Sequence, residues 1–315
     1  VLAVGSVSND FGTEGVAEHC FFLDSHMQAE KFHLALLNQF LRVSQKQDGE
    51  QLHLAIVGGG ATGVELSAEL YHVADLLKVY GMKSMSAKRV KISLIEAGSR
   101  ILPALPARIA LSAKRELVKL GVEILENTRV VSANERGFVN GDGEQIDADM
   151  MVWAAGVKAP NFIRSIEGLE TARGGTVVVK PTLQSTTSDD IYVIGDCCAC
   201  EQKDGSFVPP RAQAAHQMAT LAFKNIIANR NGRELKSYVY HDHGSLVNLS
   251  RYSTVGNLMG NLSGGNFFIE GRIARFVYVS LYRMHQIAIH GWVKASAIFL
   301  AQKVAKSVKP KMKLH

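Results

Sequence analysis

The feature that most constrains the fold of this chain is a glycine loop between a short apolar stretch and an amphipathic one. Residues 52–57 are almost wholly apolar and run directly into Gly58, Gly60 and Gly63, which form a Gly-x-Gly-x-x-Gly pattern. Glycines in this position permit a tight turn and a close approach of the main chain to a pyrophosphate. The helix that follows would present its free N–H groups to the phosphates. The pattern therefore predicts a strand, a turn and a helix that bind a dinucleotide. The apolar face predicted for that helix carries Leu66, Leu70, Val73 and Leu77.

An acidic residue ends the next predicted strand, 90–96. The carboxylate of Glu96 is placed to accept hydrogen bonds from the two ribose hydroxyls of NAD, and its charge would repel the 2′-phosphate of NADP. The interval between the glycine loop and Glu96 exceeds the usual ~20 residues, and we attribute the surplus to an extended helix and a basic loop at 78–89. Arg100 could in principle accept a phosphate. We expect NADH as the coenzyme.

Glu65 is predicted to lie in the first turn of the helix that follows the glycine loop. A carboxylate there complements the helix dipole, which is one explanation for it. The other is that Glu65 lies beside the nicotinamide and the electron acceptor. The spacing in the sequence leaves both explanations open.

The order of predicted elements around this loop is strand, helix, strand, helix, strand, followed by a small antiparallel excursion and a further strand. This order is typical of the nucleotide-binding half of a doubly wound α/β fold. One long helix or two broken helices at 24–45 precede it, and the turn signal Asn-Gly-Asp-Gly at 140–143 marks the antiparallel excursion. The other elements expected here are a helix at 106–120 and strands at 122–125 and 150–154.

A second acidic residue follows a buried strand in the later half of the chain. The predicted strand 191–194 ends in Gly195 and Asp196, and a helix is expected at 211–228. Asp196 could accept hydrogen bonds from two adjacent hydroxyls, and the helix would direct its positive end toward whatever lies beside them. A bare Gly-Asp pair after a strand is often only a turn.

Over its whole length, segment 186–196 resembles the flavin ribityl-binding motif of the two-dinucleotide-binding-domain flavoproteins, which share a glutathione-reductase-like fold. The resemblance implies that Asp196 holds the ribityl chain of FAD and that the following helix faces the flavin pyrimidine. Segments 1–6 and 152–157 look like the two strand-to-glycine segments that close each nucleotide domain of this fold. Gly156, Gly195 and Ala214 are thereby expected among the cofactor-binding residues.

Two further segments, 211–217 and 280–292, resemble the type II NADH:quinone oxidoreductases. These are single-subunit, non-proton-pumping NADH dehydrogenases of bacterial respiratory chains, and the likeness covers nearly the whole chain. It implies hydride transfer from NADH to FAD and then transfer of two electrons to a membrane quinone. It also implies that Gln213 and Gln217 border the flavin and quinone site, and that Glu65 contacts the nicotinamide and quinone region. The implied location is the cytoplasmic face of the bacterial inner membrane, as a peripheral protein that could form a homodimer.

The resemblance places another glycine loop, for the FAD pyrophosphate, well upstream of Gly58, whereas this sequence contains one Gly-x-Gly-x-x-Gly. Residue 1 is Val within a β-rich run, so we expect an N-terminally truncated chain. The expected fold is α/β, with two Rossmann-type domains, the first (FAD) incomplete, and a C-terminal membrane-associating region. The expected division is 1–23, a remnant of the FAD domain; 24–51, a connecting helix; 52–157, the NADH domain; 158–236, the returning FAD domain; and 237–315, the membrane-anchoring region.

The basic residues of the chain are concentrated at its end. The net charge is +6, but residues 271–315 hold nine Lys and Arg and no Asp or Glu, which leaves 26 basic against 29 acidic side chains elsewhere. Such an end suits an anionic lipid surface, and the scarcity of interleaved aromatics argues against nucleic acid. On a helix, Trp292, Ser296, Phe299 and Lys303 would fall close to one line, as in an amphipathic anchor lying in the membrane plane. The alternative is a core helix with a solvated charged end.

Three of the four cysteines, Cys197, Cys198 and Cys200, lie within four positions of one another. Their Cys-x-x-Cys could indicate a metal or a thiol redox site, but no second pair or His cluster accompanies it. We therefore expect structural thiols, no metal and no disulfide framework. His216 could shuttle a proton to a reduced quinone, or could simply pack.

Two other functional interpretations remain open from the sequence. One is a soluble FAD- and NAD(P)-dependent disulfide or ferredoxin reductase of the same fold. The other is a non-catalytic fragment that binds NAD and a membrane.

Overall fold

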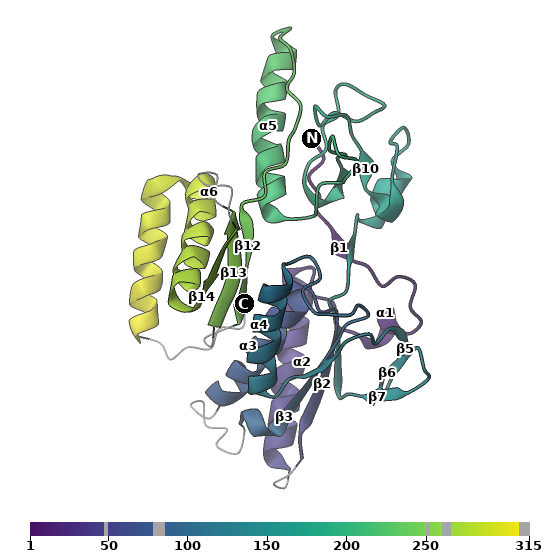
Figure 1. The fold of residues 1–315 in the computed structure, drawn as a ribbon, viewed down its shortest axis with the longest axis vertical. Coiled ribbons are helices and arrows are strands. Elements are labelled where there is room, and N and C mark those ends of the chain that lie inside the picture. Colours follow the sequence, from purple (N-terminus) through teal and green to yellow (C-terminus); the bar gives the residue numbers. More distant parts are fainter. Residues whose placement is uncertain (47–49, 78–85, 250–252, 260–265, 309–315) are drawn as a thin grey trace. The chain divides into compact units, whose positions relative to one another are not determined.

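The computed structural model describes residues 1–46, 50–77, 86–249, 253–259 and 266–308 (Figure 1). The chain divides into two compact units. The smaller consists of Val1–Asn9 and Gly156–His243, and the larger of Asp10–Ala155 and Gly244–His315. The predicted five-part division of the chain stays a prediction.

A four-stranded parallel sheet forms the centre of the larger unit, in the order β4-β3-β2-β8. Its strands are β2 (Leu52–Val57), β3 (Val90–Ile95), β4 (Glu123–Leu125) and β8 (Met150–Trp153). Val57 pairs with Ile95 on one side and with Trp153 on the other. All four predicted strands are confirmed, with ends that differ by at most one residue.

Three helices of this unit begin and end where local chemistry favours it. They are α2 (His26–Gln45), α3 (Ala61–Leu76) and α4 (Ala107–Leu120). A capping box starts α2, because the Ser25 hydroxyl accepts the N–H of Gln28 and the Gln28 side chain accepts the N–H of Ser25. Gly121, at φ 99°, ends α4 in the left-handed conformation that glycine adopts most easily. The three predicted helices are thus confirmed.

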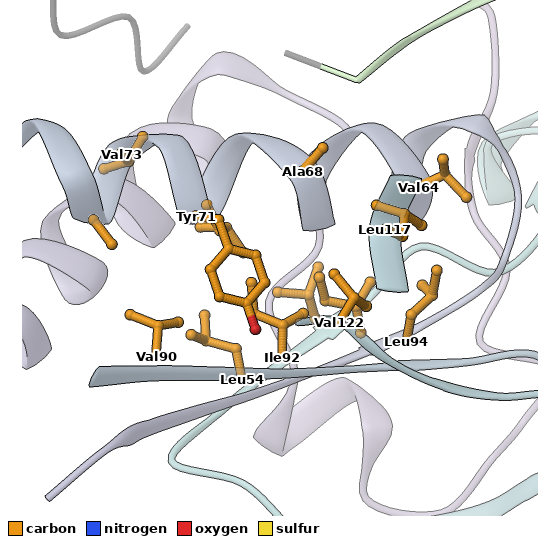
Figure 2. Close-up of a cluster of buried hydrophobic side chains, with 14 of the residues drawn as sticks. Leu54, Val64, Ala68, Tyr71, Val73, Val90, Ile92, Leu94, Leu117 and Val122 are labelled. Carbon is orange, nitrogen blue, oxygen red and sulfur yellow. The ribbon is translucent and has the colours of Figure 1, made fainter. Parts of the chain in front are cut away.

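One face of the sheet packs against these helices in a single apolar core. Figure 2 shows Leu54, Ile92 and Leu94 of the sheet beneath Val64 and Ala68 of α3. The predicted buried face of α3 is confirmed for Leu70, Val73 and Leu77, whereas Leu66 is only partly buried. The helix presents a broader face than expected, because small residues let it lie close to the strands. Those small buried residues are Gly63, Ser67, Ala68 and Ala74.

The other face of the sheet is covered by an antiparallel meander of β5 (Val130–Asn134), β6 (Gly137–Asn140) and β7 (Gln145–Asp147). Phe138 of the meander contacts Trp153 of the sheet at a ring-centroid distance of 6.3 Å. The predicted turn at 140–143 is confirmed. The Asn140 side-chain oxygen accepts the backbone N–H groups of Asp142 and Glu144 and so closes the turn. A single-turn helix, α1 (Val16–His19), also belongs to this unit.

The larger unit also contains an antiparallel sheet of β12 (Gly244–Leu249), β13 (Ser253–Met259) and β14 (Asn266–Glu270). Val247 and Leu249 are buried in the same core as α3. The helix α6 (Gly271–Val308) is interrupted at Gly291, at φ 74° and ψ 166°. Its two segments lie side by side (Figure 1), and the Arg283 guanidinium joins them by donating to Gln302 at 2.8 Å. Within the described residues, no helix has both the length and the apolar character needed to cross a bilayer.

The smaller unit holds one long helix, α5 (Ala212–Arg230), and short strands. The strand pairs are β1 (Val7–Ser8) with β9 (Val157–Lys158), and β10 (Val177–Val178) with β11 (Cys198–Ala199). Continuous strands were predicted at 1–6 and 191–194, and this is wrong. These residues form isolated bridges, such as Leu2 with Val193. The ladder stays short because the chain turns at Gly5 and Gly195, both at positive φ. Among the described residues, short 3₁₀ turns lie at Ala87–Arg89, Asn161–Ser165, Arg173–Gly175 and Gly195–Cys197.

Candidate functional site

The three motif glycines of the loop after β2 have different surroundings. A Cβ atom at Gly58 would lie 2.6 Å from the carbonyl carbon of Ala154, and one at Gly63 would lie 2.0 Å from the Gly58 oxygen. Both positions therefore require glycine for the turn and for the close packing of α3 on the sheet. At Gly60 a Cβ would meet nothing within 4 Å. The open space at Gly60 is where a ligand can approach the main chain.

The N-terminus of α3 begins at this open position. Gly60 is the N-cap residue, and no side chain caps the helix there. The first N–H groups of a helix have no partner within the helix, and they carry the positive end of its dipole. Together with the bare backbone at Gly60, they form a site suited to a phosphate or pyrophosphate.

Glu96 directly follows β3, one residue beyond the end of the strand, and its side chain reaches the glycine loop. Its Oε2 accepts the N–H of Gly59 at 2.8 Å, and its Oε1 accepts the N–H of Gly98 at 2.7 Å. Sequence reasoning missed the contribution of Gly59 and Gly98, although a glycine two residues after the acid was a readable signal. Arg100 directs its guanidinium to the carbonyl oxygen of Pro103 at 3.0 Å. Residues 78–85 of the predicted basic loop lie outside the described residues.

Glu65 is not in the first turn of α3, which corrects the prediction. The helix starts at Ala61, so Glu65 is its fifth residue, and the dipole effect falls off beyond the first turn. Its Oε1 accepts the backbone N–H of Asn248 in β12 at 2.9 Å. Burial raises the pKa of Glu65, and the hydrogen bond from Asn248 partly opposes that rise. Glu65 is thus a partly buried carboxyl that joins α3 to the C-terminal sheet of the same unit.

In the smaller unit, Gly195, Asp196 and Ala214 line one cavity of about 260 Å³. The Ser6 hydroxyl donates to Asp196 Oδ2 at 2.8 Å. Gly195 has φ 75°, a conformation that favours glycine. Gly156 precedes Val157 and Lys158, which also line the cavity. The structure therefore brings together most of the residues expected to bind the second cofactor.

This cavity offers groups that fit the ribityl and ring end of a flavin. The Asp196 carboxylate can accept hydroxyl hydrogen bonds. The start of α5 has no side-chain cap, so its N–H groups can face a ring that accepts negative charge. The side chain of Ala214 is small and buried, which leaves room for a flat ring beside the helix.

The side-chain amides of Gln213 and Gln217 both contact the segment 241–243. Gln217 donates to the carbonyl of His241 at 2.8 Å and accepts its N–H at 3.1 Å. Gln213 accepts the N–H of His243 at 2.9 Å and donates to Asp242 at 3.1 Å. The two glutamines share a helix face, as predicted, and they hold the residues that end the smaller unit.

The three clustered cysteines are buried free thiols, and Cys198 lines the cavity beside Asp196. Burial raises the pKa of Cys200 to about 11 and also raises that of Cys198. Such thiols stay protonated at neutral pH and are poor ligands and nucleophiles. In the described part of the chain, no group of three or more His, Cys, Asp or Glu could hold a metal ion.

Large apolar side chains are exposed near the break and in the second segment of α6. Trp292 is 73% exposed and Val293 is 85% exposed, whereas Ala295 is buried. Phe299 lies under the Arg283 guanidinium, 4.9 Å from its ring centroid. The side chain of Lys303 lies outside the described residues. The segment therefore presents large apolar side chains on its outer surface.

Comparison with known proteins agrees with this arrangement. Residues 1–219 match the family model described as pyridine nucleotide-disulphide oxidoreductase. The chain is 44% identical over 330 residues to a type II NADH:quinone oxidoreductase of Haemophilus influenzae, covering 100% of this chain and 74% of the relative. It is 32% identical to the enzyme of the same name from Staphylococcus aureus, covering 84% of this chain and 66% of that protein.

A similar fold has been solved experimentally. The structure of NDH2 from Plasmodium falciparum in complex with NADH superposes with a TM-score of 0.79 at 19% identity, covering 99% of this chain and 78% of that one. At this identity the likeness shows a common fold.

Proposed function

Because the chain belongs to the type II NADH:quinone oxidoreductases, within the pyridine nucleotide-disulphide oxidoreductase family, we propose that it takes part in the reduction of a quinone by NADH. The observation that carries the proposal is the glycine loop of the larger unit. Its open backbone at Gly60, its uncapped helix and the adjacent Glu96 form a site for an NAD pyrophosphate and ribose.

Each part of NADH would have its own group in this site. The pyrophosphate would rest on the backbone at Gly60 and on the first N–H groups of α3, while Gly58 and Gly63 allow the turn. The carboxylate of Glu96 would accept the adenosine ribose hydroxyls.

The smaller unit would hold FAD through Asp196, Gly195, Gly156 and Ala214. When bound, FAD would supply the redox chemistry, since it accepts a hydride from NADH and passes two electrons to the quinone. The chain would then contribute binding and orientation. Asp196 would hold the ribityl hydroxyls, and the start of α5 would direct its positive end at the ring. Such a reaction depends on alignment and electrostatics and needs no strong nucleophile.

Three further residues are proposed to serve the quinone side of the reaction. Glu65 is a partly buried carboxyl whose burial raises its pKa, so it suits proton exchange near neutral pH better than an exposed glutamate does. The amides of Gln213 and Gln217 are engaged with segment 241–243, so both would position the chain that borders the flavin and quinone site. His216 is exposed on α5 and remains an alternative proton carrier.

The second segment of α6 is proposed to attach the protein to lipid. Exposed Trp292, Val293 and Leu300, with Lys294 beside them, suit a peripheral helix in the plane of an anionic membrane. The proposed location is the cytoplasmic face of the bacterial inner membrane, and the protein could form a homodimer there. Each basic residue near anionic lipid contributes ~1 kcal/mol, so vesicle binding should weaken as salt rises.

The rival function is a soluble disulfide or ferredoxin reductase of the same fold. The exposed apolar surface of α6 favours the membrane enzyme over it. The buried, protonated thiols of Cys198 and Cys200 also argue against a dithiol that exchanges with substrate.

The proposal is tested by three measurements on the purified chain. Calorimetry measures NADH binding, the visible spectrum reports flavin, and a quinone assay compares reduction with and without lipid vesicles. NADH binding, a flavin spectrum and quinone reduction together would support the enzyme. Binding of NADH with no flavin absorbance would favour the alternative of a non-catalytic NAD- and membrane-binding fragment. Failure to bind NADH would refute the proposal.

A further inference from the structure

The carboxylate of Glu96 is held at both oxygens by the main chain. Gly59 donates to Oε2 at 2.8 Å from the glycine loop, and Gly98 donates to Oε1 at 2.7 Å from the loop after β3. Hydrogen bonds to a carboxylate are short and stronger than those between neutral groups. Two of them, one on each oxygen, fix both the position and the rotation of the carboxylate plane.

A side chain at either donor would collide with Glu96, so both donors are glycines. A Cβ at Gly59 would lie 2.8 Å from Glu96 Oε2 and 3.0 Å from its Cβ, and a Cβ at Gly98 would lie 3.0 Å from Oε1. Neither glycine has a positive φ, so the backbone itself would accept alanine. The missing side chains leave space for this carboxylate.

A third contact joins the two loops that hold Glu96. We call the pair of N–H donors, Gly59 and Gly98, the Glu96 clamp. The N–H of Leu102 donates to the carbonyl oxygen of Gly59 at 2.7 Å. Leu102 is buried and adopts φ 50°, a left-handed conformation that is costly for a branched side chain. Strain of this kind persists where the surrounding structure enforces it, and it clusters at ligand sites. The loop from Glu96 to Leu102 is therefore tied to the glycine loop before any ligand binds.

We propose that Gly59 and Gly98 are positioning residues that set coenzyme specificity by locking the Glu96 carboxylate in place. A carboxylate has about four acceptor positions, and the two backbone donors leave capacity for the two ribose hydroxyls of NADH. A carboxylate that cannot rotate away also keeps its negative charge where the 2′-phosphate of NADPH would lie. The inference rests on the proposed NADH site and names what makes that site selective.

The test compares the affinity for NADH and for NADPH, measured by calorimetry on the full chain. Gly98→Ala keeps the N–H but pushes against Oε1, so NADH should bind about ten-fold more weakly, the effect of disturbing one charge-assisted pair of contacts. NADPH affinity should not fall, so the preference for NADH drops by the same factor. The matched control is Gly141→Ala, which also has an ordinary φ and whose nearest neighbour is the Arg129 oxygen at 3.8 Å. This control should leave both affinities unchanged.

A double-mutant cycle separates the clamp from a general effect on the fold. In a Glu96→Ala background there is no carboxylate to displace, so adding Gly98→Ala should change neither affinity. The clamp is overturned if Gly98→Ala preserves the wild-type preference, weakens both coenzymes equally, or acts equally in the Glu96→Ala background. A wild-type chain that does not bind NADH would instead overturn the proposed function, and the clamp with it.

Discussion

Gly60 and Gly63 are three residues apart in one motif, yet alanine should affect a different property at each position. Alanine at Gly63 places a methyl carbon 2.0 Å from the Gly58 oxygen and 3.2 Å from a Leu94 methyl carbon. Alanine at Gly60 places it in open space. We therefore expect Gly63→Ala to damage the fold and Gly60→Ala to damage binding alone.

The size of each effect follows from these distances. Ordinary contact begins near 3.4 Å, so α3 must move away from Gly58 by about 1.4 Å to admit the methyl group at Gly63. Overpacking that shifts backbone costs about 3 kcal/mol, which lowers the Tm of a unit this large by roughly 6–12 °C. At Gly60 the backbone is extended at φ −71°, which alanine adopts freely, so stability should change by less than about 0.5 kcal/mol. The added methyl group would meet the pyrophosphate, and NADH should bind about ten-fold more weakly or worse.

Thermal unfolding and calorimetric titration with NADH on the same preparations test both expectations. Gly60→Ala should melt with the wild type and bind poorly, whereas Gly63→Ala should melt early. If Gly60→Ala binds NADH as tightly as the wild type, the open space at Gly60 is not the pyrophosphate site and the reasoning is wrong.

Three other predictions each concern one residue. Burial raises the pKa of Glu65 in the folded protein, so the ionised carboxylate opposes folding above that pKa. Glu65→Gln should therefore raise the Tm at neutral pH, and this gain should vanish as the pH falls toward 4.5. An equal gain at both pH values would contradict this. In protein that carries its flavin, Gln217→Ala should impair quinone reduction while flavin reduction by NADH is preserved. Stopped-flow absorbance measures the two half-reactions separately, and equal loss of both would exclude the assigned role. Asn225→Ala should lower the free energy of unfolding, measured by urea denaturation, by about 3 kcal/mol, because the buried amide makes three hydrogen bonds to Thr182 and Lys236. A loss below about 1 kcal/mol would mean that water replaces these hydrogen bonds.

Elements defined by local patterns were readable from the sequence. The strand at 52–57 was predicted to the residue, because an almost wholly apolar run bounded by a glycine turn suits a parallel strand buried on both faces. The ends of α2 and α4 follow from Ser25 and Gly121, whose side-chain and backbone chemistry acts within four residues. The segment 191–194 carries an equally apolar pattern but forms only bridges, because pairing depends on a partner strand that the pattern does not specify.

In the candidate site, too, the residues set by local patterns were predicted and the contacts between distant segments were not. The glycines and Glu96 were identified because each directly follows a predicted strand and the glycines also precede a predicted helix. Contacts that join distant segments were not predictable, since nothing local encodes them. Asn248 donates to Glu65 across 183 positions, and His243 donates to Gln213 across 30. Even the position of Glu65 within its helix was misjudged, because the first turn is counted from a start that only the structure reveals.

The contact between Glu65 and Asn248 also bears on how the C-terminal region acts. That region was predicted to anchor the protein to the membrane, and Val247 and Leu249 of β12 are buried in the same core as α3. The helix α3 therefore meets the proposed pyrophosphate site at its first residues and β12 a turn later, through Glu65. A displacement of β12 would carry the N–H donor to Glu65 and the apolar contacts of α3 with it, because packed interiors transmit movement rather than absorb it. Any membrane contact made by α6 would thus be made by the same folded unit that holds the proposed coenzyme site.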